Sequence, residues 1–288
     1  MVAIQVDNLT KRYGEHVAVD GISFQVEQGE AFGILGPNGA GKTTTLEMIE
    51  GLRKPDSGQV HVLGKPVWPD PRSVQSLIGV QLQSTTLFDR LTSRELLELF
   101  ARFYNRTDGA ERAQVVLEQV GLVSKADAYA DDMSGGQQQR LAIALALVHD
   151  PDVVFLDEPT TGLDPQARRN LWDVIRAIHA DGGKTVVLTT HYLEEAETLC
   201  DRVAIMDESR VIALDTPAGL IASLGAEVRI SYTEGGEERV AYAHDAQGAV
   251  LETLEAARQR GAQIDGLSVR GPSLEDVFLK LTGREFRE

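Results

Sequence analysis

The sequence is poor in cysteine and has no long apolar run. A single cysteine, Cys200, occurs among the 288 residues, so no disulfide can form within the chain and a reducing compartment suits it. No apolar run approaches the roughly 18 residues of a membrane span. The N-terminal stretch MVAIQVDNLTKR also lacks the pattern of a secretory signal peptide. If the protein works at a membrane, another protein must hold it there.

Basic residues are scarce relative to acidic ones. The 28 Lys and Arg against 44 Asp and Glu give a formal net charge of −16, which makes the chain a poor general partner for nucleic acid. We therefore expect no nucleic-acid partner, although local patches can differ from the total. A hydrophobic fraction of 42% and a charged fraction of 25% are typical of a soluble globular protein. The length suggests one large or two modest domains.

Turn residues and apolar periodicity predict an α/β organisation. Short strands are indicated at 2–6 and 17–26, and AFGIL at 31–35 indicates a buried strand. From about residue 84 to 150 the spacing becomes helical, with Thr92 and Glu95 as a possible capping box. DVVFLDE, TVVLTT and a hairpin then continue the α/β pattern. The composition shifts near 222–226, and residues 223–288 alternate strand and helix signals, which indicates a small α+β module. Its last helix is predicted to be capped by Ser273 and Asp276.

The stretch DDMSGGQQQR precedes an apolar helix and contains more glycine than a helix start needs. Ser134 and Gln137 form a capping box in the sequence pattern. Gly135 and Gly136 lie in the first turn, where each costs about 0.5–1 kcal/mol relative to Ala. Exposed backbone N–H groups at a positive helix end suggest that an anion approaches closely.

The first strong chemical signal is a phosphate-binding loop. The pattern G-x-x-x-x-G-K-[ST] lies between a buried strand and a helix, where its mechanism requires it. The residues are Gly36, Pro37, Asn38, Gly39, Ala40, Gly41, Lys42 and Thr43, followed by Thr44. Lys42 would reach the β- and γ-phosphates, and the Thr43 hydroxyl would bind Mg²⁺. We expect nucleotide phosphate binding here.

VVFLDE supplies an acidic pair at the end of a buried strand. In open α/β sheets, ligands lie at such strand ends. Asp157 would hold Mg²⁺ through water, and Glu158 would point to the other side and polarise the attacking water. A solvated turn or a helix cap is the ordinary alternative for such a pair.

These motifs together resemble those of ATP-binding cassette (ABC) transporter ATPase subunits. GPNGAGKTT, MSGGQQQR, VVFLDEP, TTGLDP and the histidine of LTTHYLEEAE occur in the family order, over about residues 1–222. The resemblance implies a P-loop core with an antiparallel β subdomain and a helical subdomain at about 84–150. The module at 223–288 and the ending PSLEDVFLKLTGR resemble the drug- and antibiotic-export group, including the daunorubicin-resistance type.

The resemblance also assigns roles to residues outside the phosphate loop. Tyr13 matches the aromatic residue that stacks on adenine, with an exposed turn tyrosine as the alternative. Gln83 matches the glutamine that contacts Mg²⁺ and senses the membrane partner, with Gln81 as the competing choice. Asp164 matches the loop that crosses to the other subunit and can also cap a helix. His191 would contact the γ-phosphate and orient Glu158, with a structural histidine as the alternative.

In the family, two cassettes pair head to tail around ATP. Ser134, Gly135, Gly136 and Gln137 of one subunit would close the site that the phosphate loop of the other opens. A homodimer is expected, and a heterodimer is the alternative. Met133 departs from the family, which usually has Leu there. Such exchanges usually cost under ~1.5 kcal/mol.

The function implied is ATP hydrolysis that powers a separate membrane permease. We expect an exporter of drugs or other small hydrophobic molecules, bound at the cytoplasmic face of the membrane through that permease. An importer ATPase and a non-transport ABC ATPase associated with DNA or ribosomes are the alternatives. The non-transport proteins typically carry long coiled-coil inserts or two cassettes, and this chain has neither.

Overall fold

The computed structural model describes residues 1–82, 88, 90–180, 183–225 and 228–283, which fall into two compact units. The first unit is Met1–Leu214 and the second is Asp215–Arg287. Helix α8 (Pro217–Ala222) belongs to the second unit and contacts α10 (Leu274–Thr282) there. The sequence pattern predicts a domain boundary after residue 222, and this boundary stays a prediction.

An antiparallel sheet forms the outer layer of the first unit. Its strand order is β2-β1-β4-β5. The bounds are Val2–Tyr13 for β1, His16–Glu27 for β2, Ser57–Val62 for β4 and Lys65–Pro66 for β5. The short strands predicted at 2–6 and 17–26 are parts of two 12-residue strands. Register shifts interrupt the pairing of β1 and β2, and Asn8 (φ 47°) lies within one of them. These irregularities break the alternation that marks a long strand in sequence.

The central sheet has six strands in the order β10-β9-β3-β8-β7-β6. The bounds are Ala31–Leu35 for β3, Ile78–Gln81 for β6, Val153–Asp157 for β7, Thr185–Thr190 for β8, Arg202–Asp207 for β9 and Arg210–Asp215 for β10. β3 pairs in parallel with β8 and β9, and β7 pairs in parallel with β6 and β8. β3, β7 and β8 are buried at every residue, because helices cover both faces. Their carboxyl ends meet at one edge, where ligands bind in such sheets.

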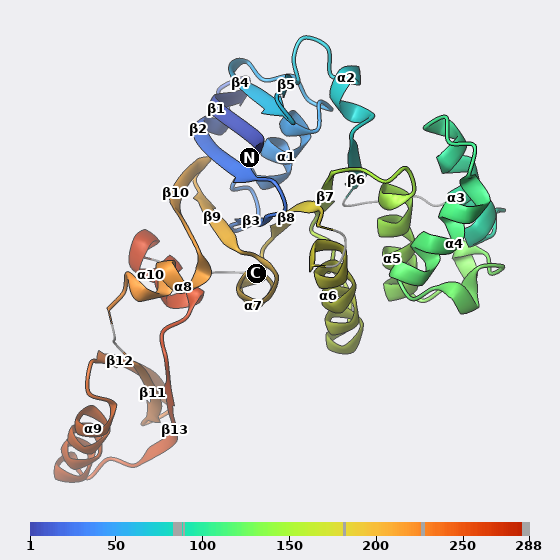
Figure 1. The fold of residues 1–288 in the computed structure, drawn as a ribbon. Helices are drawn as coiled ribbons and strands as arrows, with labels where there is room; N and C mark the ends of the chain where they lie inside the picture. Colours follow the sequence, from blue (N-terminus) through green and yellow to red (C-terminus); the bar gives the residue numbers. More distant parts are fainter. Residues whose placement is uncertain (83–87, 89, 181–182, 226–227, 284–288) are drawn as a thin grey trace. The chain divides into compact units, whose positions relative to one another are not determined.

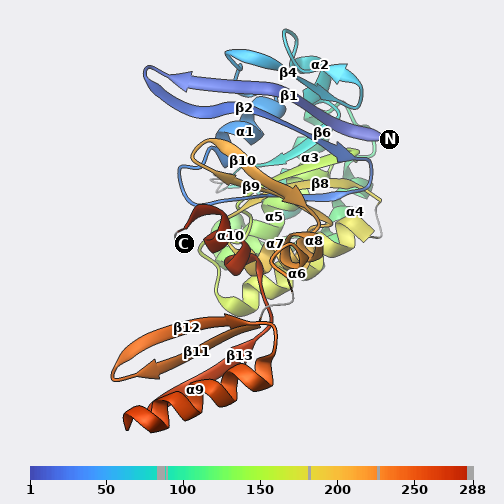
Figure 2. The same ribbon diagram turned by 90° about the vertical axis from the view of Figure 1, so that its left-hand side faces the viewer.

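Helix α1 (Lys42–Ile49) lies between the two sheets and contacts strands of both (Figures 1 and 2). The rings of Phe24 and Phe32, one from each sheet, stack with centroids 5.2 Å apart. The opposite face of the central sheet is covered by α5 (Gly135–Leu147) and α7 (Leu193–Leu199), with α6 (Pro165–Ala180) packed against both helices. One hydrophobic core therefore joins both sheets and α1.

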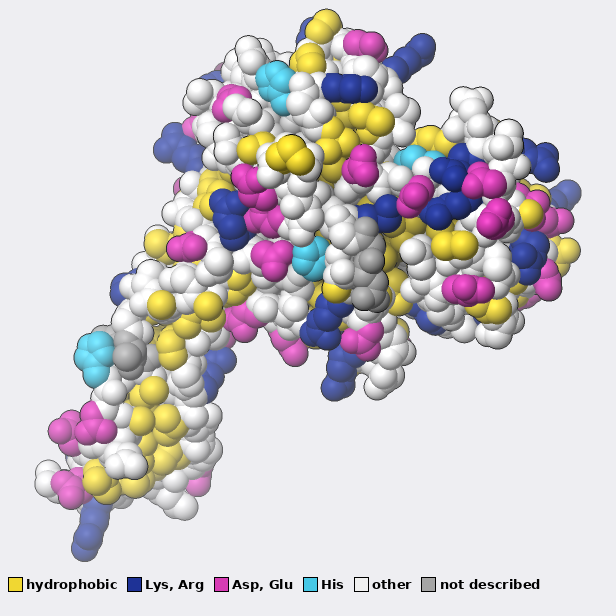
Figure 3. Space-filling view, viewed as in Figure 1, with side chains coloured by type: hydrophobic (Ala, Val, Ile, Leu, Met, Phe, Trp, Pro, Cys, Tyr) yellow, Lys and Arg dark blue, Asp and Glu magenta, His cyan; other side chains and the backbone are white. Residues whose placement is uncertain are grey.

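The helical segment consists of α3 (Ser93–Phe103) and α4 (Gly109–Gln119), which pack against each other and against α5. The predicted capping box at the start of α3 is confirmed by reciprocal bonds between Thr92 and Glu95. Figure 3 shows acidic and basic side chains interspersed on the visible face of this segment. At the other end of α5, a Cβ atom on Gly79 would collide with the carbonyl oxygen of Ala146. The backbone of β6 therefore lies directly against α5. The first unit also contains the short helix α2 (Arg72–Gln75) and two 3-10 turns, Val123–Lys125 and Ala130–Asp132.

The second unit is a small α+β fold. Its sheet has the order β12-β11-β13, with bounds Val228–Glu234 for β11, Glu237–Ala243 for β12 and Ile264–Arg270 for β13. Helix α9 (Ala246–Arg260) contacts β11 and β13. The predicted capping of α10 by Ser273 and Asp276 is confirmed. None of the helices in the described part of the chain combines the length and apolarity needed to span a bilayer.

Candidate functional site

The phosphate loop connects the end of β3 to the start of α1 in a tight turn. Gly41 has φ 100°, a backbone conformation that favours glycine, and a Cβ atom there would collide with the carbonyl oxygen of Ala18. A Cβ atom on Gly36 would collide with the carbonyl oxygen of Met206. Both glycines are therefore required by close backbone packing just before the start of α1, and helix starts of this kind can bind anions.

An open depression of about 370 Å³ lies over this loop. That volume is within the usual range for small-ligand sites. It is lined by Tyr13, His16, Ala18, Asn38, Gly39, Gly41, Lys42, Thr43, Thr44 and Glu158. Tyr13 is 43% exposed, with the guanidinium of Arg53 5.5 Å from its ring centroid. His16 was not predicted as a site residue, although it pairs with Tyr13 across the β1–β2 turn.

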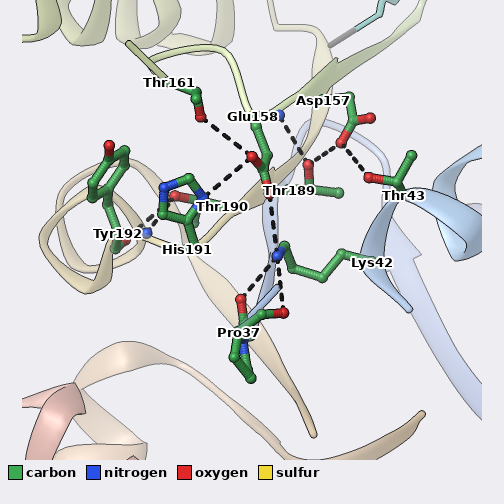
Figure 4. Close-up of polar contacts among 11 residues, drawn as sticks. Pro37, Lys42, Thr43, Asp157, Glu158, Thr161, Thr189, Thr190, His191 and Tyr192 are labelled. Atoms are coloured by element: carbon green, nitrogen blue, oxygen red, sulfur yellow. Dashed lines mark hydrogen bonds and ion pairs between the residues drawn. The ribbon is translucent and has the colours of Figure 1, made fainter. Parts of the chain in front are cut away.

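Lys42 lines the depression, and Figure 4 shows its polar contacts. Its Nζ atom donates to the carbonyl oxygens of Gly36 (2.9 Å) and Pro37 (3.3 Å). The same atom lies 3.2 Å from Glu158 Oε1. The ammonium is buried and held by oxygen atoms on several sides, so its position is fixed before any ligand binds.

Asp157 ends β7 and faces Thr43 at the start of α1. Its Oδ1 atom accepts hydrogen bonds from the hydroxyls of Thr43 (3.2 Å) and Thr189. Burial raises the pKa of Asp157, the two threonine hydroxyls act in the opposite direction, and the charge of Glu158 raises it further. The carboxylate and the Thr43 hydroxyl are hard oxygen donors, the type that Mg²⁺ prefers.

Glu158 lies between Lys42 and His191. Its Oε2 atom is 3.2 Å from His191 Nδ1 and accepts a hydrogen bond from the Thr161 hydroxyl at 3.3 Å. Burial would raise its pKa, but the charges and hydrogen bonds of Lys42 and His191 outweigh burial, and the pKa of Glu158 is lowered. The carboxylate is therefore ionised at neutral pH and can accept a proton from water.

Thr189 is a residue of this site that the sequence analysis missed. Glu158 has φ 46°, an uncommon conformation for a residue other than glycine, and its N–H donates to Thr189 Oγ1 at 2.9 Å. Since the same hydroxyl donates to Asp157, one threonine orients both acidic residues. The available signal was its place near the end of the buried strand that leads to His191.

The SGGQ stretch does not line the depression of its own chain. Ser134 caps α5, and its backbone N–H donates to Gln137 Oε1 at 3.0 Å, which completes the predicted capping box. A Cβ atom on Gly136 would lie 3.0 Å from the Cβ of Ala167, whereas one on Gly135 would meet only a Leu163 methyl at 4.0 Å. Packing against α6 accounts for glycine at 136, but nothing in the chain's own packing requires glycine at 135.

Three other residues singled out in the sequence lie around the site. Asp164 is exposed, and its Oδ1 accepts from the backbone N–H groups of Gln166 and Ala167, each at 2.9 Å. Gln81 ends β6 and is 1% exposed, with its amide bonded to the Leu82 carbonyl at 2.5 Å. Gln83 lies outside the described residues, so the choice between the two glutamines remains open. Met133 is 7% exposed and packs beneath the cap.

The chain is similar to known proteins over most of its length. Residues 19–161 match the family model described as "ABC transporter". The chain is 44% identical over 307 residues to "Nod factor export ATP-binding protein I" of Paraburkholderia xenovorans (strain LB400), covering 99% of both chains. It is 42% identical over 304 residues to the protein of that name from Sinorhizobium fredii (strain NBRC 101917 / NGR234), covering 100% of this chain and 88% of the relative.

Solved structures match the first part of the chain. The ATP-binding cassette MJ0796, in a dimeric post-hydrolysis state bound to ADP and Pi, has a TM-score of 0.67 at 29% identity. The match covers 74% of this chain and 98% of that one. The protein cbiO1 from Clostridium perfringens, part of the ABC transporter complex cbiONQ, has a TM-score of 0.72 at 29% identity, over 77% and 92% of the two chains.

Proposed function

Because the chain belongs to the ABC transporter family and is an ATPase of that family, we propose that it is the ATP-hydrolysing subunit of an exporter. The matches to family members confirm the family, the fold class and the ATPase activity that the motifs predict. Export is favoured because similarity to the Nod factor export proteins extends over the second unit as well as the cassette. By resemblance to the drug-export group, the proposed cargo is a drug or another small hydrophobic molecule.

The observation that carries the proposal is the position of Glu158. Its ionised carboxylate lies between Lys42 and His191 at the edge of the depression. In the proposed reaction, Glu158 accepts a proton from the attacking water, and His191 holds Glu158 in position. Lys42 and the N–H groups of the phosphate loop neutralise the charge on the β- and γ-phosphates. Tyr13 stacks on the adenine at the rim.

Thr43 and Asp157 are the residues that fit Mg²⁺. Their oxygen atoms are 3.2 Å apart, and one carboxylate plus a hydroxyl is the sparse protein ligand set that magnesium–nucleotide sites use. Mg²⁺ held there would supply positive charge that helps to neutralise the phosphates of ATP. Gln83 or Gln81 is proposed as a further oxygen ligand.

The site is proposed to be completed by a second copy of the chain. Ser134, Gly135 and Gly136 start α5 away from their own depression, and room for a ligand exists at Gly135. A head-to-tail pair would place these N–H groups against the γ-phosphate in the partner's depression. The dimeric neighbour bound to ADP and Pi supports this arrangement. The exposed Asp164 loop is proposed to cross the same interface.

The helical segment is proposed to receive a membrane permease at the cytoplasmic face of the membrane. Phe103, at the end of α3, is 65% exposed and Tyr104 is 37% exposed. Exposed aromatic side chains of this kind are enriched where protein partners bind. ATP-driven closure of the cassette pair would then move the permease.

Replacement of Glu158 by Gln tests this function. The variant should bind ATP, lose about 100-fold or more of kcat, and form a stable dimer with ATP, because the proton acceptor is lost while the phosphate contacts remain. Light scattering after gel filtration with ATP measures the dimer. Lys42→Ala is the control, since it should lose ATP affinity and dimerisation together. A monomeric Glu158→Gln protein that still hydrolyses ATP would exclude the composite site.

A further inference from the structure

Glu195 is a carboxylic acid that is 0% exposed, beneath the hydrolytic site. It lies in α7, four residues after His191, on the helix face that also buries Ala196 and Leu199. Acidic side chains are almost never fully buried without partners that hold them. The sequence pattern does not predict this burial, because the surrounding LEEAE stretch is rich in acidic residues.

The partners of Glu195 come from the neighbouring helix and from two loops. Its Oε1 atom accepts a hydrogen bond from the indole N–H of Trp172 at 3.0 Å. Burial raises the pKa of Glu195, and the hydroxyls of Thr190 and Thr160, the Trp172 indole and the charge of Arg168 lower it. Among the described residues, the buried Glu195 Oε2 and Thr160 Oγ1 atoms have no hydrogen bond of normal geometry, so the only well-formed hydrogen bond to Glu195 is that of Trp172.

Two of these neighbours, Thr160 and Thr190, lie next to residues of the proposed reaction. Thr160 is fully buried and follows Glu158 by two positions. Thr190 immediately precedes His191, and its hydroxyl accepts the N–H of Tyr192 at 2.9 Å, which closes the turn around His191 (Figure 4). The loops of the base and of the histidine therefore share one buried carboxyl group.

Glu195 is also linked to α6, the helix whose first residue follows Asp164. Arg168 lies one helical turn before Trp172, and its guanidinium lies 4.0 Å from the centroid of the Tyr192 ring. The indole of Trp172 fixes the same helix to Glu195. Movement of the Asp164 loop would therefore be transmitted to α7 and to the turn that carries His191.

We propose that Glu195 is a positioning residue for ATP hydrolysis. By joining α6 to the turns after Glu158 and before His191, it keeps the imidazole at its 3.2 Å distance from the Glu158 carboxylate. This inference rests on the proposed roles of Glu158 and His191. Displacements of an ångström at a reacting group can lower a rate by about 100-fold, so the link acts on kcat rather than on ATP affinity.

The test compares steady-state ATP hydrolysis and Tm for Glu195→Met, Trp172→Phe and the double variant. Glu195→Met should lower kcat about tenfold or more with KM for ATP within about threefold, because the phosphate loop is untouched. The double variant also removes the unpaired indole, so it should regain much of the lost Tm but not kcat. Glu195→Gln keeps an acceptor for Trp172 and should retain kcat within about threefold.

Glu30→Met is the matched control. Glu30 is 7% exposed and lies 3.2 Å from Arg202, at the amino end of β3, away from the phosphate loop. This variant should lower Tm without changing kcat by more than about threefold. If Glu30→Met lowers kcat as much as Glu195→Met, or if kcat returns with Tm in the double variant, Glu195 is merely structural and the inference is wrong.

Two further outcomes separate the inference from the function on which it rests. An active Glu158→Gln protein would refute the proposed base, whatever Glu195 does. An inactive Glu158→Gln protein together with a fully active Glu195→Met protein would overturn only the positioning role. If Glu195→Met does not fold, Trp172→Phe breaks the same hydrogen bond from α6, and an unchanged kcat in that variant then overturns the inference.

Discussion

Replacement of Glu50 by Gln should make the stability of the protein much less sensitive to alkaline pH. Glu50 ends α1, is 1% exposed, and its Oε1 atom has no hydrogen bond among the described residues. Burial, together with the smaller effects of the charges of Asp157 and Glu47, raises its pKa from 4.5 to about 8. The folded protein therefore holds a proton on Glu50 at neutral pH.

The direction of the effect follows from proton binding. A carboxyl group with a raised pKa in the folded state contributes stability that is fully present below about pH 4.5 and is lost as pH rises through about 8. One pKa unit corresponds to about 1.4 kcal/mol, so this group alone removes on the order of 4 kcal/mol of unfolding free energy between pH 5 and pH 9. Gln at this position has no proton to lose, so the variant lacks this loss.

Urea unfolding of the nucleotide-free protein at pH 5, 7 and 9 measures the difference. The unfolding free energy of Glu50→Gln minus that of the wild type should increase steadily with pH. Glu47→Gln is the control: Glu47 is partly exposed and ion-paired with Arg53 (2.5 Å), so its replacement should show a much smaller pH dependence. A difference for Glu50→Gln that is the same at pH 5 and pH 9 would refute the reasoning.

Two further predictions concern ligand contacts. Gly135→Ala should fold with normal stability but lose ATP hydrolysis, because its added methyl group meets only Leu163 at 4.0 Å yet enters the proposed phosphate position. Gly136→Ala should instead lower the unfolding free energy by about 1–3 kcal/mol through contact with Ala167, so denaturation and ATPase assays together distinguish the two glycines. Tyr13→Ala should weaken ATP binding by about 1–3 kcal/mol, whereas Tyr13→Phe should not, as equilibrium nucleotide titration would show; equal affinity in both variants would exclude adenine stacking.

Features set by a few adjacent residues could be predicted from the sequence. The caps formed by Thr92, Ser134 and Ser273 each depend on a polar side chain and its third neighbour, and all three are present. The phosphate loop and the acidic pair at 157–158 also follow from local patterns. That the phosphate loop and the acidic pair lie close to His191 was predicted only from the order of the motifs in the ABC transporter family.

Features that depend on distant parts of the chain could not be predicted in the same way. The shifts between β1 and β2 depend on cross-strand packing, so two long strands looked like short pieces. Thr189 looked like an ordinary strand residue until its hydroxyl met Asp157. Glu50 directly follows α1 and Glu195 lies in α7, and only contacts with distant parts of the chain bury these two carboxyl groups.

Helix α5 also makes the two nucleotide sites of the proposed dimer dependent on each other. It begins at Ser134, facing the partner's ATP, and its far half lies on the backbone of β6 at Gly79 and contacts β7, which carries its own chain's Asp157. A shift of α5 at the partner's nucleotide site would therefore also displace β7 and the acidic residues at its end. The close contact at Gly79 would thus give the proposed dimer a path between its two nucleotide sites, and any coupling along it would be reciprocal.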